Sequence, residues 1–149
     1  MTNINNIKSV IINRISSDIT KVQDTADYEK TGFSGFPAVT IFCSGNENDY
    51  ESTSDNLRTF TFIIRIHEQL GKIPQLDAVS DNAKQRAERI LGDVVSEIID
   101  SFDKYYTLGG AVDICKATPS RWGYAEIPEG WARIAEIKIE CKKSFDITS

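Results

Sequence analysis

The sequence has little of the side-chain chemistry on which most enzymes and metal sites depend. Its 149 residues include one histidine, His67, and three cysteines, Cys43, Cys115 and Cys141, which are far apart and form no C-x-x-C pair. No residue near His67 in the sequence pairs with it as a nucleophile. A glycine-rich phosphate loop, an H-E-x-x-H motif and the carboxylate spacing of a calcium loop are also missing. We therefore predict a protein that is not an enzyme and that has no cofactor and no metal site.

These few reactive residues are expected to have structural roles instead. Each cysteine falls within a strand-like run, which favours buried, reduced thiols that act as small apolar side chains. His67 is expected to be a partly exposed strand residue, and Glu126 and Glu129 are expected to be solvated.

Long apolar runs and an excess of basic residues are absent as well. No run approaches the roughly 20 apolar residues of a membrane span, and the N-terminus lacks the basic and apolar regions of a signal peptide. We therefore expect no membrane insertion and a chain that stays in the cytoplasm. The 17 basic and 22 acidic residues give a net charge of −5, which disfavours a surface built to bind many phosphates. The length predicts a single domain, residues 1–149, with a substantial core.

Two strand-like runs joined by a polar segment form the centre of the pattern. Phe36–Cys43 is rich in β-branched and aromatic residues and has a proline at its start, which is typical of a strand beside a loop. Leu57–His67 has period-two patterning, with Phe60, Phe62, Ile64 and Ile66 on one face and polar residues on the other, where Ile63 breaks the pattern. Between them, residues 45–56 are rich in turn-forming side chains and predict a long exposed hairpin loop.

Two amphipathic helices are predicted from apolar residues at three- and four-residue steps. The first extends from Ile4 to Val22, and its apolar face is expected to pack on a sheet, with a partner-binding helix as the alternative. A connecting loop follows at residues 23–35, and Phe33 and Phe36 are expected to hold it in place. The second helix begins after a cap at Asp77 or Ser80, continues to about Tyr105, and is expected to be stopped by the glycines at 109–110.

The charges on the second helix oppose its dipole, since basic residues lie early and acidic residues lie late. Local pairing at four-residue spacing is one explanation. The alternative is that the two ends of the helix meet oppositely charged surfaces on neighbouring subunits. The predicted local pairs are Lys84 with Glu88, Arg89 with Asp93, and Asp100 with Lys104.

Two further strands are predicted near the C-terminus, at residues 111–118 and 131–143. In the second, Ala135, Ile137, Ile139 and Cys141 share one face and charged residues share the other. The segment between the strands, residues 119–130, is predicted to be a loop rich in aromatic residues. Trp122 and Tyr124 there either mark a contact site or fold back onto the sheet edge.

The order of these elements predicts the α+β class. We expect a mostly antiparallel four-stranded sheet with two helices packed on one face, in the order α-β-β-α-β-β, with the sequential strands forming two hairpins.

Within that order, four segments together resemble the tail terminator proteins of long-tailed bacteriophages, the lambda-type minor tail proteins. The segments are Phe36-Pro37-Ala38-Val39, the strand from Arg58 to Ile64, the helix from Ala87 to Ile99, and Trp131-Ala132-Arg133-Ile134-Ala135-Glu136-Ile137. The resemblance spans nearly the whole chain and is carried by length, element order and short apolar signatures.

This resemblance implies a structural virion protein that is made in the host cytoplasm and located in the phage tail. Such a protein forms a homo-oligomeric, hexameric ring that caps the tail tube protein, ends tube polymerisation and joins a head completion or neck protein, while DNA passes through its lumen without specific binding. Alternatives are another head-to-tail connector or neck ring protein, and a small cytoplasmic ligand-binding domain or enzyme. The candidate interface residues are Arg121, Trp122, Tyr124, Arg86, Arg89, Asp49 and Tyr50.

Overall fold

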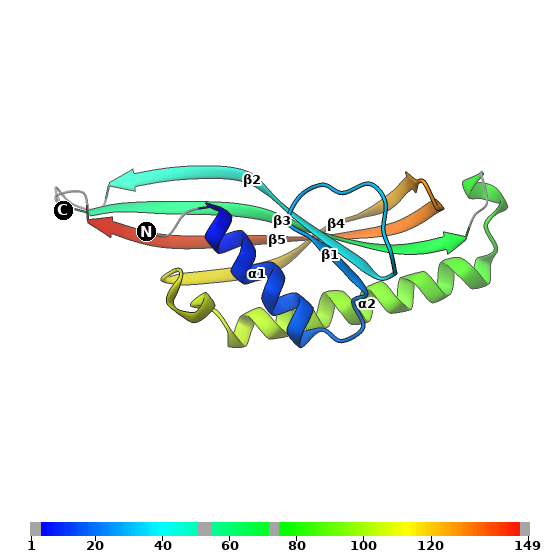
Figure 1. Ribbon diagram of the computed structural model, residues 1–149, viewed down its shortest axis with the longest axis horizontal. Coiled ribbons are helices and arrows are strands. Elements are labelled where there is room, and N and C mark those ends of the chain that lie inside the picture. Colours follow the sequence, from blue (N-terminus) through cyan, green and yellow to red (C-terminus); the bar gives the residue numbers. More distant parts are fainter. Residues whose placement is uncertain (1–3, 51–54, 72–74, 147–149) are drawn as a thin grey trace.

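A computed structural model describes the backbone of residues 4–50, 55–71 and 75–146, with side chains for all of these except 46–50, 55–56 and 145–146. It contains two α-helices, five β-strands and two short 3-10 turns (Figure 1). In chain order these are α1 (Ile4–Asp18), β1 (Asp24–Ala26), β2 (Ala38–Tyr50), β3 (Asp55–Gly71), a 3-10 turn (Leu76–Ala78), α2 (Asp81–Lys104), a second turn (Leu108–Gly110), β4 (Ile114–Ile127) and β5 (Gly130–Asp146).

The predicted four-stranded, mostly antiparallel sheet in the order α-β-β-α-β-β is wrong. The sheet is mixed and has five strands, in the spatial order β1-β2-β3-β5-β4. The additional strand, β1, lies within the segment predicted as a loop and pairs in parallel with Ala38–Thr40 of β2. A strand of three residues is too short to show an alternating pattern, so its pairing with β2 alone defines it.

The predicted hairpin loop at residues 45–56 is also wrong wherever the structure describes it. β2 continues to Tyr50 and β3 begins at Asp55, so that Asn46 lies opposite Phe60 and Tyr50 lies opposite Asn56. Residues 51–54 lie outside the described part of the chain. The turn-forming composition of this segment is overridden because it pairs with β3, which itself pairs with β5.

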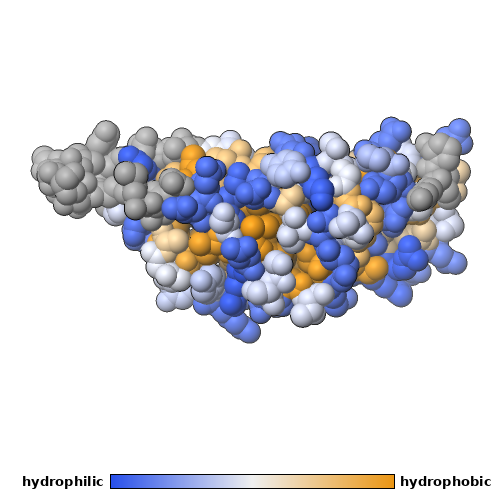
Figure 2. Space-filling model, viewed as in Figure 1, coloured by the Kyte–Doolittle hydropathy of each residue, from blue (hydrophilic) through white to orange (hydrophobic). Residues whose placement is uncertain are grey.

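Both helices cover the same face of the sheet, and the core lies between the two layers. The predicted faces of the two central strands are confirmed, since every apolar residue named for β3 and β5 is buried. From α1 the core receives Ile7, Ile11 and Ile15, and from α2 it receives residues that include Leu91, Ile98 and Phe102. Figure 2 shows apolar residues gathered over the middle of the molecule, between hydrophilic residues.

The strands are long compared with the layer of helices that covers them. β3 and β5 each have 17 residues, which corresponds to an extended length of roughly 55 Å per strand. α2 has 24 residues and is therefore roughly 36 Å long. The sheet consequently extends beyond the helices at the end where β2 stops and β5 finishes (Figure 1). Neither helix of the described residues has the length and apolarity that a membrane crossing needs.

α2 begins at the cap formed by Ser80, which is one of the two caps that the sequence predicts. The Ser80 hydroxyl accepts a hydrogen bond of 3.2 Å from the backbone N–H of Ala83. The helix ends at Lys104, four residues before the turn that contains the two glycines. Gly109 and Gly110 both adopt positive φ, which lets the chain reverse direction before β4.

The Ser80→Ala substitution should destabilise the protein by about 1 kcal/mol, because one backbone N–H at the start of α2 loses its partner. Urea unfolding followed by circular dichroism measures this change. Ser96→Ala is the matched control, since Ser96 is exposed in the middle of α2 and caps nothing. Equal midpoints for the two variants would contradict the capping role.

Candidate subunit interface

The segment that contains Trp122 and Tyr124 is a strand, so the loop predicted at residues 119–130 is wrong. β4 continues to Ile127, and the turn to β5 is confined to Pro128 and Glu129. Aromatic side chains favour strands, and Trp122 and Tyr124 find cross-strand partners in Ala135 and Arg133.

Pro119 interrupts the ladder between β4 and β5 only briefly. The register shifts between Pro119 and Trp122, which marks a β-bulge. A proline is compatible with β4 because β4 is an edge strand, where a missing N–H can face away from the sheet. The residues that looked loop-like in sequence are therefore accommodated by the sheet edge.

Trp122, Tyr124 and Arg133 pack together as an aromatic–cationic stack, which we call the Arg133 stack. The Arg133 guanidinium carbon lies 5.3 Å from the ring centre of Trp122 and 4.6 Å from that of Tyr124. Arg133 Nε donates a hydrogen bond of 2.8 Å to Glu88 in α2, and Nη1 donates one of 3.0 Å to the carbonyl of Gly123. Arg133 is therefore held from three sides.

The Arg133 stack remains accessible despite these contacts. Trp122 is 36% exposed and Tyr124 is 42% exposed. The prediction that the rings fold back onto the sheet edge is confirmed by their packing on Arg133. The alternative, that they mark a contact site, stays a prediction. Rigid aromatic residues that are exposed beside an arginine are typical of energetically important contact sites.

The sheet has two edges that are open in the described residues. The outer side of β4 has no partner strand, although the outward N–H of Cys115 donates to the carbonyl of Tyr106 at 2.7 Å, and β2 is covered by β1 only at Ala38–Thr40. The remainder of β2, as far as Tyr50, forms the second open edge. Long unpaired edges are uncommon in isolated subunits because they offer hydrogen-bonding groups to other chains.

Asp49 and Tyr50 lie far from the Arg133 stack, on the opposite edge of the sheet. Asp49 pairs with Leu57 of β3. Trp122 pairs with Ala135 of β5, which in turn pairs with Ile66 of β3. Leu57 and Ile66 are nine positions apart in the same strand, which corresponds to about 30 Å. The structure therefore separates the candidate residues into two regions.

Arg86 and Arg89 lie on the exposed surface of α2, in the same half of the helix as Glu88. The positive charge of Arg86 interacts electrostatically with Glu68, a buried residue on the helix-facing side of β3. Burial raises the pKa of Glu68, while the positive charge of Arg86 opposes that shift. One of the two arginines therefore has a partner within the subunit.

The three local ion pairs predicted along α2 are not formed in the part of the chain that the structure describes. Glu88 pairs with Arg133 instead, and Lys21 lies 3.5 Å from Asp93 and 3.7 Å from Glu97. For Glu88 and Asp93, partners from other elements thus replace the expected neighbours along the helix. The alternative, contact with a neighbouring subunit, stays a prediction.

The other face of the sheet contains an ionic cluster that sequence analysis missed. Arg65 Nε donates a hydrogen bond of 2.7 Å to Glu136, which also lies 3.4 Å from Arg121, and Arg65 is 3.6 Å from Glu29. These residues are distant in sequence, and the alternation of β3 and β5 was the only signal that two of them share a face. Arg121 thus belongs to this cluster and not to the Arg133 stack.

His67 is buried beside this cluster, so its predicted partial exposure is wrong. It is 6% exposed because residues 27–37 cross over it, and its ring lies 4.6 Å from that of Phe33. Phe33 in turn packs edge-on against Phe36 at 5.7 Å, which agrees with the expected role of these rings. Burial, followed by the charge of Arg65, lowers the pKa of His67 to about 4. A small cavity of about 180 Å³ adjoins it.

Comparison of the sequence with models of known protein families and with curated proteins finds no match. In the described residues, no group of three or more His, Cys, Asp or Glu side chains is placed to hold a metal ion.

Proposed function

We propose that this chain is the subunit of a ring that caps a phage tail tube, ends tube polymerisation and provides the surface to which the head is joined. The resemblance described in the sequence analysis supports this function. The structural observation that carries it is the pair of unlike open edges on opposite sides of one elongated sheet.

A closed ring needs a head-to-tail interface in which two different surfaces of the subunit meet. β4 offers one such surface, with the exposed rings of the Arg133 stack. The open part of β2 offers the other, and its sequence includes the acidic residues Glu47 and Asp49. Contact between β4 of one subunit and β2 of the next would join these two unlike edges.

The virion location, the partners and the DNA-filled lumen belong to the same proposal. The net charge of −5 supports a channel through which DNA passes without specific binding, because an acidic wall does not retain phosphates. A ligand-binding domain with a pocket between sheet and helices is less well supported, since buried apolar side chains fill that space.

Negative-stain electron microscopy of the purified protein, alone and mixed with isolated tail tubes, tests the proposal. We expect rings with an open centre, or a ring seated at one end of each tube. Particles that stay monomeric and never bind tubes would contradict it.

The same experiment with filled heads separates a terminator from another connector or neck protein. A terminator should bind the tube end in preference to the head, because it completes the tail before joining. Preferential binding to filled heads would favour the connector.

A further inference from the structure

Cys115 and Cys141 lie directly opposite each other on β4 and β5. The backbone N–H of Cys115 donates to the carbonyl of Tyr106 at 2.7 Å, so it points away from β5. The two cysteines are therefore a non-hydrogen-bonded pair, the class of antiparallel position in which Cα atoms are about 4.5 Å apart and the side chains are closest. That separation lies within the range spanned by disulfides.

Both side chains are free thiols on the helix-facing side of the sheet. A hydrogen bond joins them, and it lowers the pKa of Cys115 while it raises that of Cys141. Cys115 is therefore the thiol that more readily becomes a thiolate, the reactive form. Cys43 has different surroundings, since it lies opposite Phe62 and its thiol donates to the Gly45 carbonyl at 3.5 Å.

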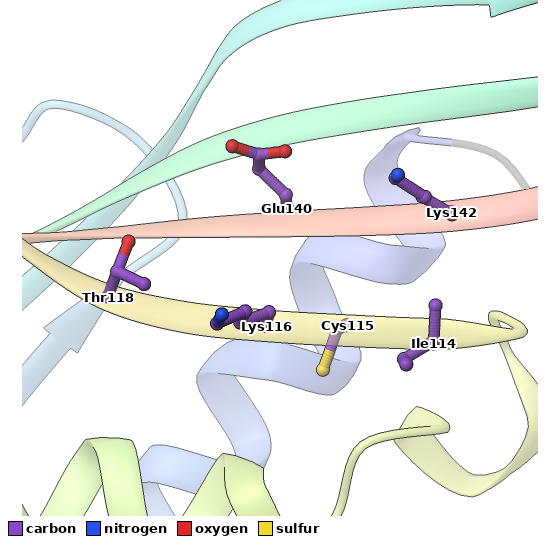
Figure 3. Close-up of a pocket in the computed structure, with 6 residues that line it drawn as sticks. All are labelled: Ile114, Cys115, Lys116, Thr118, Glu140 and Lys142. Atoms are coloured by element: carbon purple, nitrogen blue, oxygen red, sulfur yellow. The ribbon is translucent and has the colours of Figure 1, made fainter.

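A hollow of about 410 Å³ at the β4 edge lies on the face of the sheet opposite the two thiols, where Ile114, Lys116 and Thr118 of β4 alternate with Cys115. Figure 3 shows the Cys115 sulfur on the side of β4 away from Glu140 and Lys142 of β5, which line the same hollow. Cys115 is 5% exposed, whereas Cys141 is fully buried. Of the two thiols, Cys115 on the edge strand is therefore the one with some exposure to solvent, and Cys141 is shielded.

We propose that Cys115 and Cys141 form an intramolecular disulfide when a small hydroperoxide, such as hydrogen peroxide, oxidises the protein. The Cys115 thiolate attacks one peroxide oxygen, the O–O bond breaks, and hydroxide leaves while Cys115 becomes a sulfenic acid. The Cys141 sulfur then attacks the Cys115 sulfur, an S–S bond forms, the S–O bond breaks, and water carries away the Cys141 proton. In total, two thiols and one peroxide give one disulfide and two waters.

The disulfide would link the edge strand β4 to β5, the neighbouring interior strand of the sheet. Because a cytoplasm keeps thiols reduced and the exterior does not, this linkage would follow release of the protein from a cell. That consequence rests on the proposed function, whereas the formation of the disulfide does not.

Oxidation of the purified full-length chain with hydrogen peroxide, followed by quenching and intact mass spectrometry, tests the proposal. We expect the loss of two hydrogen atoms, restoration of the original mass by dithiothreitol, and a peptide linkage between Cys115 and Cys141 after digestion without reduction. The melting temperature should rise by roughly 5 °C on oxidation, since the unfolded chain is constrained.

Cys43→Ser is the matched control and should form the disulfide as the wild type does, while Cys115→Ser should not form it. Linkage through Cys43, a disulfide between two molecules, or overoxidation of Cys115 without any linkage would each overturn the proposal. The peptide map of the wild type decides the question even if a cysteine variant fails to fold.

Discussion

Replacing Trp122 and Tyr124 together with alanine should leave the subunit folded and remove most of its ability to form rings. Both rings contact Arg133 but lie outside the main buried core, so the fold does not depend on them. Exposed aromatic residues at the centre of an interface typically contribute about 2 kcal/mol each, which is roughly a 30-fold change in affinity per residue. Sedimentation velocity measures the assembly, and circular dichroism confirms that the subunit is folded.

Tyr106→Ala is the matched control for this experiment. Tyr106 is also an exposed aromatic residue, but it lies beyond the end of α2, near the start of β4, and not in the Arg133 stack. Its replacement should leave assembly unchanged. Normal rings and normal tube capping by the double variant would show that the Arg133 stack is not a subunit contact, and the interface would then have to involve other parts of the two edges.

Acidification from pH 6.5 to pH 4 should destabilise the protein through His67 by up to about 3 kcal/mol. Burial and the neighbouring Arg65 lower the pKa of His67 from 6.5 to about 4. Between these values the unfolded chain binds a proton at His67 and the folded chain does not, so the free energy of unfolding falls as pH falls. Between the two pKa values, His67 lowers the free energy of unfolding by about 1.4 kcal/mol for each pH unit of acidification.

Urea unfolding across this pH range, for the wild type and for His67→Phe, measures that contribution. The phenylalanine keeps a ring against Phe33 but binds no proton, so the variant should lose less stability on acidification. Parallel pH profiles for the two proteins would show that His67 titrates alike in the folded and unfolded chain.

Glu68 provides an internal check, because its contribution to stability changes with pH in the direction opposite to that of His67. Burial raises the pKa of this carboxyl group above 4.5, and Arg86 only partly opposes the shift. The folded chain therefore holds the Glu68 proton to higher pH than the unfolded chain does, and stability from this residue falls as pH rises. Glu68→Gln removes this contribution, so its loss of stability on acidification should be steeper than that of the wild type.

Local periodicity was sufficient to predict the elements that form the core. The four-residue steps of Ile7, Ile11 and Ile15 and the alternation from Phe60 to Ile66 each repeat one preference over many residues. Burial in the structure follows these repeats closely. The Ser80 cap was predictable for a similar reason, since a capping side chain bonds its own chain three residues ahead.

Pairing between distant segments decided the features that sequence analysis missed. Residues 45–50 and 119–127 have loop-like composition and are strands because β3 and β5 lie beside them. β1 exists only through its contact with β2.

The features of the candidate sites also fall into those that the sequence determined and those that the tertiary structure determined. Sequence alone determined that the protein has two amphipathic helices over one face of a sheet, few reactive residues and a net negative charge. Only the tertiary structure placed Arg133 between Trp122 and Tyr124, covered His67 with Phe33 and set Cys115 opposite Cys141. The physical reason is that helix and strand periodicity is encoded within one segment, whereas strand order and register depend on which distant surfaces bury each other best.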